Sequence, residues 1–366
     1  MNRFVCILLI AVLLVASLGG CAASTESSPK PTDPTTSASS TTTSTTTSTT
    51  TPSAPVEPPK DLHFNPLTGV NDLESKNNRP VAIMVANDST TRGNQAGIDK
   101  ADFYLECETE GSIPRLLAVF ASVDRVPNKI GPVRSARTPF INMARTLGAI
   151  YVHWGYSQPA KKLLNTGVIN NINALATKDV FWRDEALWAA MNKEHSGATS
   201  GSNLSAYIAK KNFSTTLSKE LPFAFGKKTG DITANTVQIK NTASNVSSFI
   251  YDASTGLYTK QYGKVTGGTT HKTIDGTPIQ VSNVLVLYAE KYAEDSNGKN
   301  TWYNFRNGSG KGYIISGGTA REINYTRTDT TLTLTEADGK TQVVFAEGKT
   351  YMFLSDKSLS DDISFS

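Results

Sequence analysis

Two arginines stand at positions 134 and 137 in the stretch IGPVRSAR, between two prolines and directly ahead of an apolar helical pattern. A helix start gathers free N–H groups and the positive end of the helix dipole, so arginines added there are unfavourable for the helix alone. Arg134 and Arg137 make sense if an anion lies opposite them. That anion is either a ligand phosphate or carboxylate, or a protein carboxylate such as Glu106, Glu108 or Glu110.

Those three glutamates alternate in the run ECETE. On a strand they face one side of the sheet, with neighbours roughly 6.6 Å apart. Three carboxylates on one face suit a divalent cation or acid and base catalysis. No His or Asp joins them at ligand spacing, so the pattern favours a structural or solvent-facing role, or pairing with the arginines.

His153 ends the apolar run AIYVHWG, which is typical of a strand. In open α/β sheets, ligands bind beyond the carboxyl ends of the strands, and this place makes His153 a candidate ligand-binding residue. The alternative is a hydrogen-bonded histidine of the core.

The segment FWRD joins two aromatic residues to an Arg–Asp pair, with Trp182, Arg183 and Asp184 as candidate binding residues. A self-satisfied ion pair beneath a tryptophan is one interpretation. A sugar platform is the other, because a sugar offers an apolar face to Trp and hydroxyl groups to Arg and Asp.

Several catalytic signatures are missing from the sequence, namely HExxH, CxxC, G-x-S-x-G, the phosphate-binding P-loop and S-x-x-K with its partner motifs. The run GSGKG at 308–312 lacks the P-loop spacing and lies in a strand-rich region, so it is a turn. We therefore predict no catalytic residues, no metal and no cofactor.

The N-terminus predicts export and a lipid anchor. Arg3 precedes an apolar run that is too short for a membrane span and ends in Leu18-Gly19-Gly20-Cys21. Small residues before a cysteine suit a lipoprotein signal peptidase, so residues 1–21 are interpreted as a lipoprotein signal peptide with Cys21 as the lipidated residue. Long acyl chains contribute about 0.8 kcal/mol per buried CH₂ and so fix a protein to a membrane.

Residues 22–60 predict a disordered stalk. Of these 39 residues, 29 are Ser, Thr or Pro, and no apolar side chain larger than Val occurs to offset the entropy of ordering. Of the three cysteines only Cys107 remains in the folded part, where it is expected to be a small core residue. The net charge of +4 is spread over a long chain, which excludes a nucleic-acid partner.

The elements that position the candidate residues follow from the apolar patterns. We predict strands at 79–88 and 149–155, a hairpin of 101–111 with 113–123 about a Gly111-Ser112 turn, and helices at 135–147, 157–167 and 204–213. From residue 223 onward, alternating β-branched runs separated by Gly and Asn turns predict an antiparallel sheet without helices. This sheet either stands alone or packs on the first part.

Several segments resemble the YerB-like lipoproteins of Gram-positive bacteria, a family with a domain of unknown function and a separate C-terminal domain. They are FNPLTGV, RPVAIMVAND, KIGPVRSAR, AIYVHWG, FWRD, VSNVLVLY and GKTYMFL. The resemblance covers nearly all of residues 61–354 and implies an envelope lipoprotein without an established catalytic activity. It also implies a Pro-His-Asn run after FWRD, where this chain has MNKEHSGATSGSNL, and His195 is the candidate for the same role.

Together these patterns predict an α+β protein. A mixed-sheet α/β domain at 61–225 is followed by a β-rich, mainly antiparallel domain at 226–366. We expect a lipid-anchored binding or interaction module on the outer face of the cytoplasmic membrane, whose partner is an anionic or carbohydrate wall component or an envelope protein. The alternatives are a hydrolase or transferase that acts on wall polymers through an arginine anion site, and a scaffold with an apolar surface patch.

Overall fold

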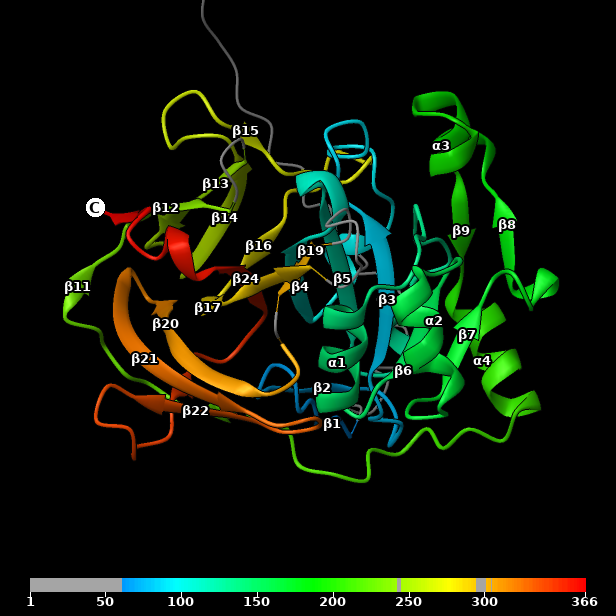
Figure 1. Cartoon of the computed structure of the whole chain (residues 1–366), viewed down its shortest axis with the longest axis horizontal. Coiled ribbons are helices and arrows are strands. Elements are labelled where there is room, and N and C mark those ends of the chain that lie inside the picture. Colours follow the sequence, from blue (N-terminus) through cyan, green and yellow to red (C-terminus); the bar gives the residue numbers. More distant parts are fainter. Residues whose placement is uncertain (1–60, 242–244, 294–300, 304) are drawn as a thin grey trace, which may run out of the picture. The chain divides into compact units, whose positions relative to one another are not determined.

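The computed structural model describes residues 61–241, 245–293, 301–303 and 305–366 (Figure 1). The predicted signal peptide, Cys21 and the stalk lie outside these residues. No helix among the described residues is long and apolar enough to cross a membrane.

One sheet of eleven strands runs through the described chain. Its order is β11 (Ile232–Thr233), β21 (Thr319–Arg327), β20 (Gly308–Ser316), β17 (Asn283–Ala289), β24 (Thr350–Asp356), β4 (Phe103–Glu108), β5 (Pro114–Phe120), β3 (Val81–Ala86), β6 (Ile150–His153) and β7 (Asn171–Asn173), with β22 (Leu332–Glu336) on the far side of β21. The pairs β17–β24, β24–β4, β3–β6 and β6–β7 are parallel, and the others are antiparallel. The sheet is therefore mixed, as predicted.

Strands from both predicted domains share this sheet, because β24 pairs with β4 from Thr350↔Phe103 to Leu354↔Cys107. The segment 226–366 thus packs on the first part instead of standing alone, the second of the two alternatives. A division of the chain at residue 225 stays a prediction.

A second sheet holds six short strands. They are β15 (Thr269–Thr270), β14 (Leu257–Tyr262), β13 (Val246–Asp252), β12 (Thr236–Lys240) and β25 (Ile363–Phe365) in order, with β16 (Gln280–Val281) on β14. Four two-stranded pairs complete the β structure: β1 (His63–Phe64) with β2 (Asn71–Leu73), β8 (Phe181–Arg183) with β9 (Gly197–Thr199), β10 (Ala224–Phe225) with β23 (Val344–Phe345), and β18 (Lys291–Ala293) with β19 (Thr301–Tyr303).

Four α-helices occur in the described residues, and all lie between 138 and 210, as the sequence predicted. They are α1 (Thr138–Thr146), α2 (Gln158–Asn165), α3 (Glu185–Ala190) and α4 (Gly201–Lys210). Ser157 caps α2 through its side chain, which accepts a hydrogen bond from Ala160 N. Helix α3 was not predicted, and α4 begins and ends three residues before the predicted bounds because Ser200 is its cap.

Helix α1 begins at Thr138, so the predicted start near Ser135 is wrong. Ala136 still forms a strand-like bridge with Tyr156, and Pro139 stands in the first turn of the helix. A backbone that bridges a distant segment cannot also enter the helix, and this contact is invisible to helical periodicity.

Both faces of the large sheet are buried at its centre, around β3, β4, β5 and β17. Ala82 and Met84 of β3 lie in one apolar cluster with Phe140 of α1, while Val81 and Ile83 lie in another with Leu204 of α4. The second cluster also contains Val237 and Phe249 of the six-stranded sheet, which covers the same face near β24. Strands buried on both faces read as continuous apolar runs, which is why β3 and the β4–β5 hairpin were predicted correctly.

Candidate anion-binding site

The segment that holds the two arginines is extended and runs between the ends of β3 and β6. Arg134 N donates to Met84 O of β3 at 2.9 Å, and Arg134 O accepts from Trp154 N, just beyond β6, at 2.9 Å. The backbone of Arg134 is thus held on both sides at the carboxyl edge of two neighbouring strands.

Arg137 is the N-cap residue of α1 and forms a two-pronged pair with Glu110. Its Nε donates to Glu110 Oε2 at 2.7 Å, and its Nη2 donates to Oε1. Burial alone raises the pKa of the Glu110 carboxyl, but the hydrogen bonds and charge of Arg137 bring it below its ordinary value. This contact is the protein-carboxylate alternative predicted for at least one arginine.

Arg134 pairs with a residue that the sequence did not suggest. Its Nη2 donates to Glu194 Oε1 at 2.7 Å, and its Nη1 donates to the backbone oxygen of Glu194 at 3.3 Å. The Glu194 side chain is 70% exposed, and the hydrogen bond and charge of Arg134 lower its pKa. The Nε of Arg134 is buried and has no hydrogen-bond partner within the described residues.

A third arginine, missed in the sequence, lies beside them. Arg115 is the second residue of β5 and stands opposite Ala86 of β3 and Cys107 of β4. Strand alternation places it on the same face as Leu117, which packs with α1. Only 5% of Arg115 is exposed, yet its Nε and Nη1 have no hydrogen-bond partner among the residues that the structure describes.

The charges around Arg115 do not balance. Burial, followed by the positive charges of Arg134 and Arg137, lowers the pKa of Arg115 to about 10, while Glu110 and Asp88 act in the opposite direction. Glu110 already pairs with Arg137 and Glu194 with Arg134. The cluster of Arg115, Arg134 and Arg137, called here the arginine cluster, therefore holds one more cation than its paired carboxylates neutralise. An arginine within the buried strand pattern PRLLAVF was the signal that sequence reasoning passed over.

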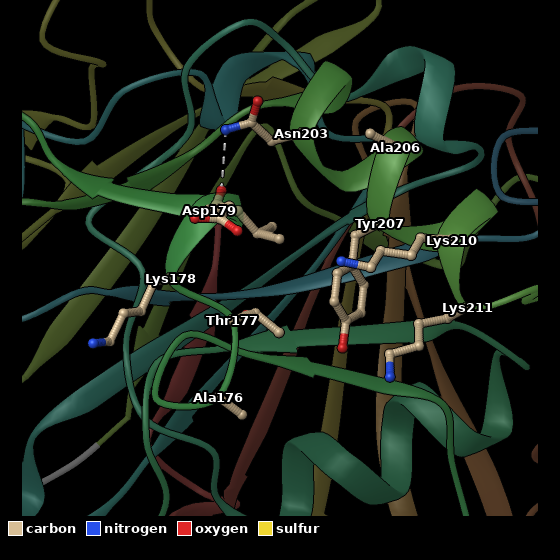
Figure 2. A pocket seen from close by; sticks show the side chains of 10 residues that line it. Ala176, Thr177, Lys178, Asp179, Asn203, Ala206, Tyr207, Lys210 and Lys211 are labelled. Atoms are coloured by element: carbon tan, nitrogen blue, oxygen red, sulfur yellow. Dashed lines mark hydrogen bonds between the residues drawn. The ribbon is translucent and has the colours of Figure 1, made fainter.

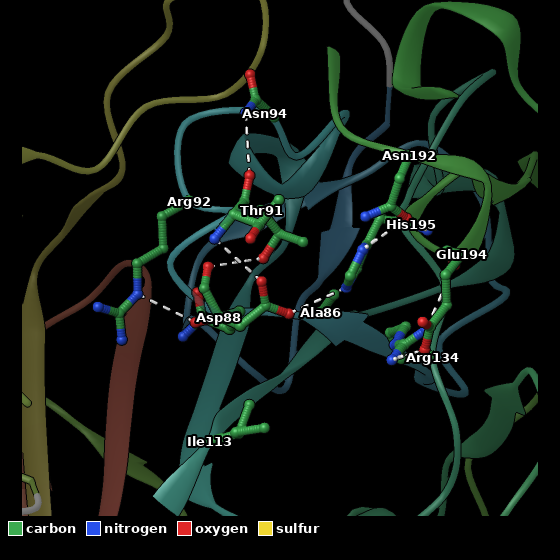
Figure 3. A network of polar contacts seen from close by, with 12 residues as sticks. Ala86, Asp88, Thr91, Arg92, Asn94, Ile113, Arg134, Asn192, Glu194 and His195 are labelled. Atoms are coloured by element: carbon green, nitrogen blue, oxygen red, sulfur yellow. Dashed lines mark hydrogen bonds and ion pairs between the residues drawn. The ribbon is translucent and has the colours of Figure 1, made fainter. Parts of the chain in front are cut away.

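His195 and its partner Asp88 lie on the side of Arg134 that Glu194 covers (Figure 3). His195 Nε2 lies 3.2 Å from Asp88 Oδ2, and His195 Nδ1 lies 3.0 Å from Asn192 Oδ1, so both ring nitrogens are engaged. The short turn Lys193–His195 thereby brings Glu194 over Arg134, as Figure 3 shows. His195 is thus near the arginines, but its other contacts hold it in place.

The six-stranded sheet anchors the loop that follows β3. Tyr262 O–H donates to Asn87 Oδ1 at 2.6 Å, and Gln95 Nε2 donates to Ala86 O at 2.8 Å. Gln95 Oε1 in turn lies 2.7 Å from His271 Nε2, and burial lowers the pKa of His271 well below its ordinary value. The neutral His271 therefore donates its Nε2 proton to Gln95 Oε1. Residues more than 170 positions away in the chain therefore fix the loop that carries Asp88.

Glu106 and Glu108 do not join the arginine cluster. Glu106 accepts a hydrogen bond from Tyr351 O–H at 2.5 Å and lies 3.5 Å from Lys260 Nζ, while Glu108 lies 3.2 Å from Lys291 Nζ. The prediction that all three glutamates face one side of the sheet is therefore wrong for Glu110. Strand β4 ends at Glu108, and Glu110 lies in a 3-10 turn, where strand alternation no longer holds. Within the described residues, no group of three His, Cys, Asp or Glu is arranged to hold a metal ion.

His153 is fully buried at the end of β6. Its Nδ1 lies 2.7 Å from Gly155 O and its Nε2 lies 3.2 Å from Asn171 Oδ1. Burial lowers its pKa. These contacts match the core-histidine alternative and leave neither ring nitrogen for a ligand. Cys107 is also buried, as expected.

The FWRD segment divides between two roles. Trp182 Nε1 donates to Asp184 Oδ2 at 3.4 Å, and Asp184 caps α3 by accepting from Leu187 N at 3.0 Å. Arg183 instead stacks 4.2 Å from the ring centre of Trp154 and donates to Glu194 O at 3.3 Å. Of this segment, Arg183 alone reaches the arginine cluster, and a sugar platform stays a prediction.

A hollow of about 360 Å³ lies between α4 and the turn before β8 (Figure 2). Lys178, Lys210 and Lys211 line it together with Tyr207 and Asp179. Figure 2 shows the amine of Lys178 pointing away from those of Lys210 and Lys211. Its cations therefore do not converge on one point.

Comparisons with known proteins agree with the resemblance. Residues 67–214 match the "Protein of unknown function (DUF3048) N-terminal domain", and residues 236–352 match its C-terminal domain. The chain is 29% identical over 295 residues to "Putative lipoprotein YerB" of Bacillus subtilis (strain 168), covering 78% of this chain and 84% of that protein. The crystal structure of YerB from Bacillus subtilis superposes with a TM-score of 0.70 at 27% identity, covering 83% of this chain and 99% of the other.

Proposed function

The chain belongs to the DUF3048 family, and from that premise we propose that it is a lipid-anchored envelope protein that binds an anionic group through the arginine cluster. The ligand carries a phosphate or carboxylate, as an anionic wall component does. Its group contacts Arg115 and Arg134 directly, while Arg137 remains paired with Glu110.

The observation that carries the proposal is the state of Arg115. A buried donor without a partner costs about 1–3 kcal/mol, and more when it is charged. Arg115 buries two such donors, and within the described part of the chain no carboxylate pairs with it. A bound oxyanion would satisfy both donors and the positive charge, because a guanidinium group matches carboxylate and phosphate geometry.

The Glu194 carboxylate supports the same proposal. It is largely exposed and is held by Arg134 on a short turn at the surface. An exposed ion pair of this kind contributes only about 0–1 kcal/mol. The Glu194 carboxylate therefore lies where the ligand anion would bind, but it is held only weakly. A ligand that also contacts Arg115 displaces it.

The place of action follows from the N-terminal sequence. Residues 1–60 carry the predicted signal peptide, lipidated Cys21 and stalk, and the related YerB bears the name of a lipoprotein. Lipidation would hold the arginine cluster near the outer face of the cytoplasmic membrane, within reach of wall polymers.

A wall-polymer hydrolase or transferase would need a free acid or base beside the anion. His195 is the candidate by position, but Asp88 and Asn192 engage both of its ring nitrogens. Binding is therefore the better supported function.

Titration calorimetry of the full chain with inorganic phosphate, acetate and maltose tests the proposal. We expect the anions to bind and maltose not to bind. Arg115→Met should weaken anion binding by about ten- to a hundredfold, because charged hydrogen bonds contribute about 1.5–3 kcal/mol. Glu194→Gln removes the competing carboxylate and should strengthen binding a few-fold. Equal anion binding by the wild type and Arg115→Met would refute the assignment.

Lys340→Gln is the matched control. It removes one positive charge from an exposed side chain in the turn after β22, far in the sequence from Arg115, Arg134 and Arg137. It should leave anion binding unchanged. A loss of equal size in this variant would mean that net charge, and not the arginine cluster, attracts the anions.

A further inference from the structure

A second hollow, of about 390 Å³, lies where α1 ends. Its walls come from five parts of the chain: the entry to β3, the end of α1, the segment before β7, the segment after α4 and the turn between β21 and β22. Arg79, Arg145, Ser214, Thr216 and Ser218 are among its lining residues. No Asp or Glu is among the described residues that line it.

Arg79 holds the walls of this hollow together. Its Nε donates to Gly148 O at 2.9 Å, its Nη1 to Ser214 O at 3.1 Å and its Nη2 to Asn170 Oδ1 at 2.9 Å. One guanidinium group thus joins three separate wall segments. Arg79 is a positioning residue, because these contacts occupy each of its nitrogens.

Arg145 has no comparable set of contacts. It stands in the last turn of α1, and its Nε is a buried donor that finds no hydrogen-bond partner in residues 61–241, 245–293, 301–303 and 305–366. A cation in this turn is favourable for the helix dipole, which explains the charge. The dipole does not explain an unsatisfied donor in the wall of a hollow.

Further cations stand behind the hollow. Arg327 is 2% exposed and donates to Asn142 O of α1 at 2.7 Å. Burial and the charge of Arg145 lower its pKa to about 10. Burial, then Arg327 and Arg145, also lower the pKa of Lys219. The nearby Asp329 is already paired with Arg306 at 2.7 Å. The field at the hollow is therefore positive.

Hydroxyl groups line the wall that the segment after α4 forms. Ser214, Thr216 and Ser218 alternate along the segment after α4, and all three are exposed and line the hollow. Hydroxyl groups donate to and accept from the hydroxyl groups of a polyol or sugar. A hollow of this size suits a small ligand.

We propose that this hollow is a second binding site, which takes a phosphate or carboxylate group carried on a hydroxyl-bearing body such as a polyol or sugar. Arg145 binds the anion, and the hydroxyls of Thr216 and Ser218 bind the body, since the Ser214 hydroxyl already donates to Thr216 O at 3.0 Å. The site is independent of the arginine cluster: Arg137 and Arg145 are eight positions apart on α1, or about 12 Å along the helix axis.

Titration calorimetry with glycerol 3-phosphate tests this site in the full chain carrying Arg115→Met, so that the arginine cluster does not contribute. We expect saturable binding that weakens with salt, because exposed charges are screened. Arg145→Gln in the same background should weaken it at least tenfold, as expected for the loss of a charged hydrogen bond. Lys340→Gln should leave it unchanged.

Two further arms identify the ligand chemistry. Glycerol without phosphate should not bind, and inorganic phosphate should bind more weakly than glycerol 3-phosphate if the hydroxyl wall takes part. Ser218→Asp places a negative charge in an exposed wall position, where it should not disturb folding, and should abolish binding.

Glycerol 3-phosphate binding that survives both Arg145→Gln and Ser218→Asp, or an absence of binding in the Arg115→Met background, would overturn this site. Neither result bears on the arginine cluster, whose test is the loss of binding between the wild type and Arg115→Met.

Discussion

Two regions of this protein bury positive charge, and they treat it in opposite ways. Lys260 of β14 is fully buried, yet it lies 3.5 Å from Glu106 Oε2, donates to Ser247 Oγ at 3.2 Å and sits 3.8 Å from the ring centre of Tyr262. Arg115 of β5 is nearly as buried, and two of its nitrogens contact no acceptor that the structure describes.

The difference is between a buried cation that has partners within the described chain and a buried cation whose donors lack them there. Lys260 joins the two sheets, and Glu106, Ser247 and Tyr262 contact its amine, although burial still lowers its pKa. Arg115 adds an uncompensated cost that folding alone does not explain.

The largest expected effect comes from breaking the compensated region. Lys260→Met leaves Glu106 buried without its cation, and we expect the free energy of unfolding to fall by about 3–5 kcal/mol in urea denaturation. Adding Glu106→Gln to this variant should restore part of the loss. Unchanged stability in the single variant would mean that Lys260 is no more needed than Arg115.

The pH dependence of stability sharpens the same contrast. Burial lowers the pKa of Lys260 from 10.5 to about 8, so between these values the unfolded chain holds a proton that the folded chain has released. Stability from this group therefore rises as the pH increases from about 8 to about 10.5. Lys260→Met should show a smaller rise over this window, whereas an identical slope would contradict the assignment.

The smallest expected effects distinguish Arg137 from Arg115. Arg137→Met leaves the partly exposed Glu110 without its partner, and we expect the free energy of unfolding to fall by about 1–3 kcal/mol. Arg115→Met removes an unpaired buried charge and should leave stability unchanged or raise it by about 1 kcal/mol. Thermal and urea unfolding of both variants measures the difference, and a larger loss for Arg115→Met would reverse the comparison.

The fold was predictable where local patterns dominate. The β3 strand, the β4–β5 hairpin and α2 follow from buried runs, a Gly-Ser turn and a capping serine. The start of α1 was not, because the bridge between Ala136 and Tyr156 depends on where β6 lies.

The candidate site was predictable only in part. The IGPVRSAR stretch identified Arg134 and Arg137, and the ECETE run supplied Glu110. Glu194 lies 60 positions from Arg134, and no periodicity connects the two. Arg115 enters the site only through the register that sets it opposite Ala86, which is a property of the assembled sheet.

The pairing of β24 between β17 and β4 has a consequence for how the chain acquires its structure. Thr350 lies opposite Phe103, so β4 cannot gain this neighbour until almost the whole chain has been synthesised. Contacts this distant in sequence slow folding, and an unpaired edge invites association with other chains. A chain cut short before residue 350 would leave both β4 and β17 with open edges. We therefore expect truncation at the C-terminus to produce aggregation instead of a smaller folded protein.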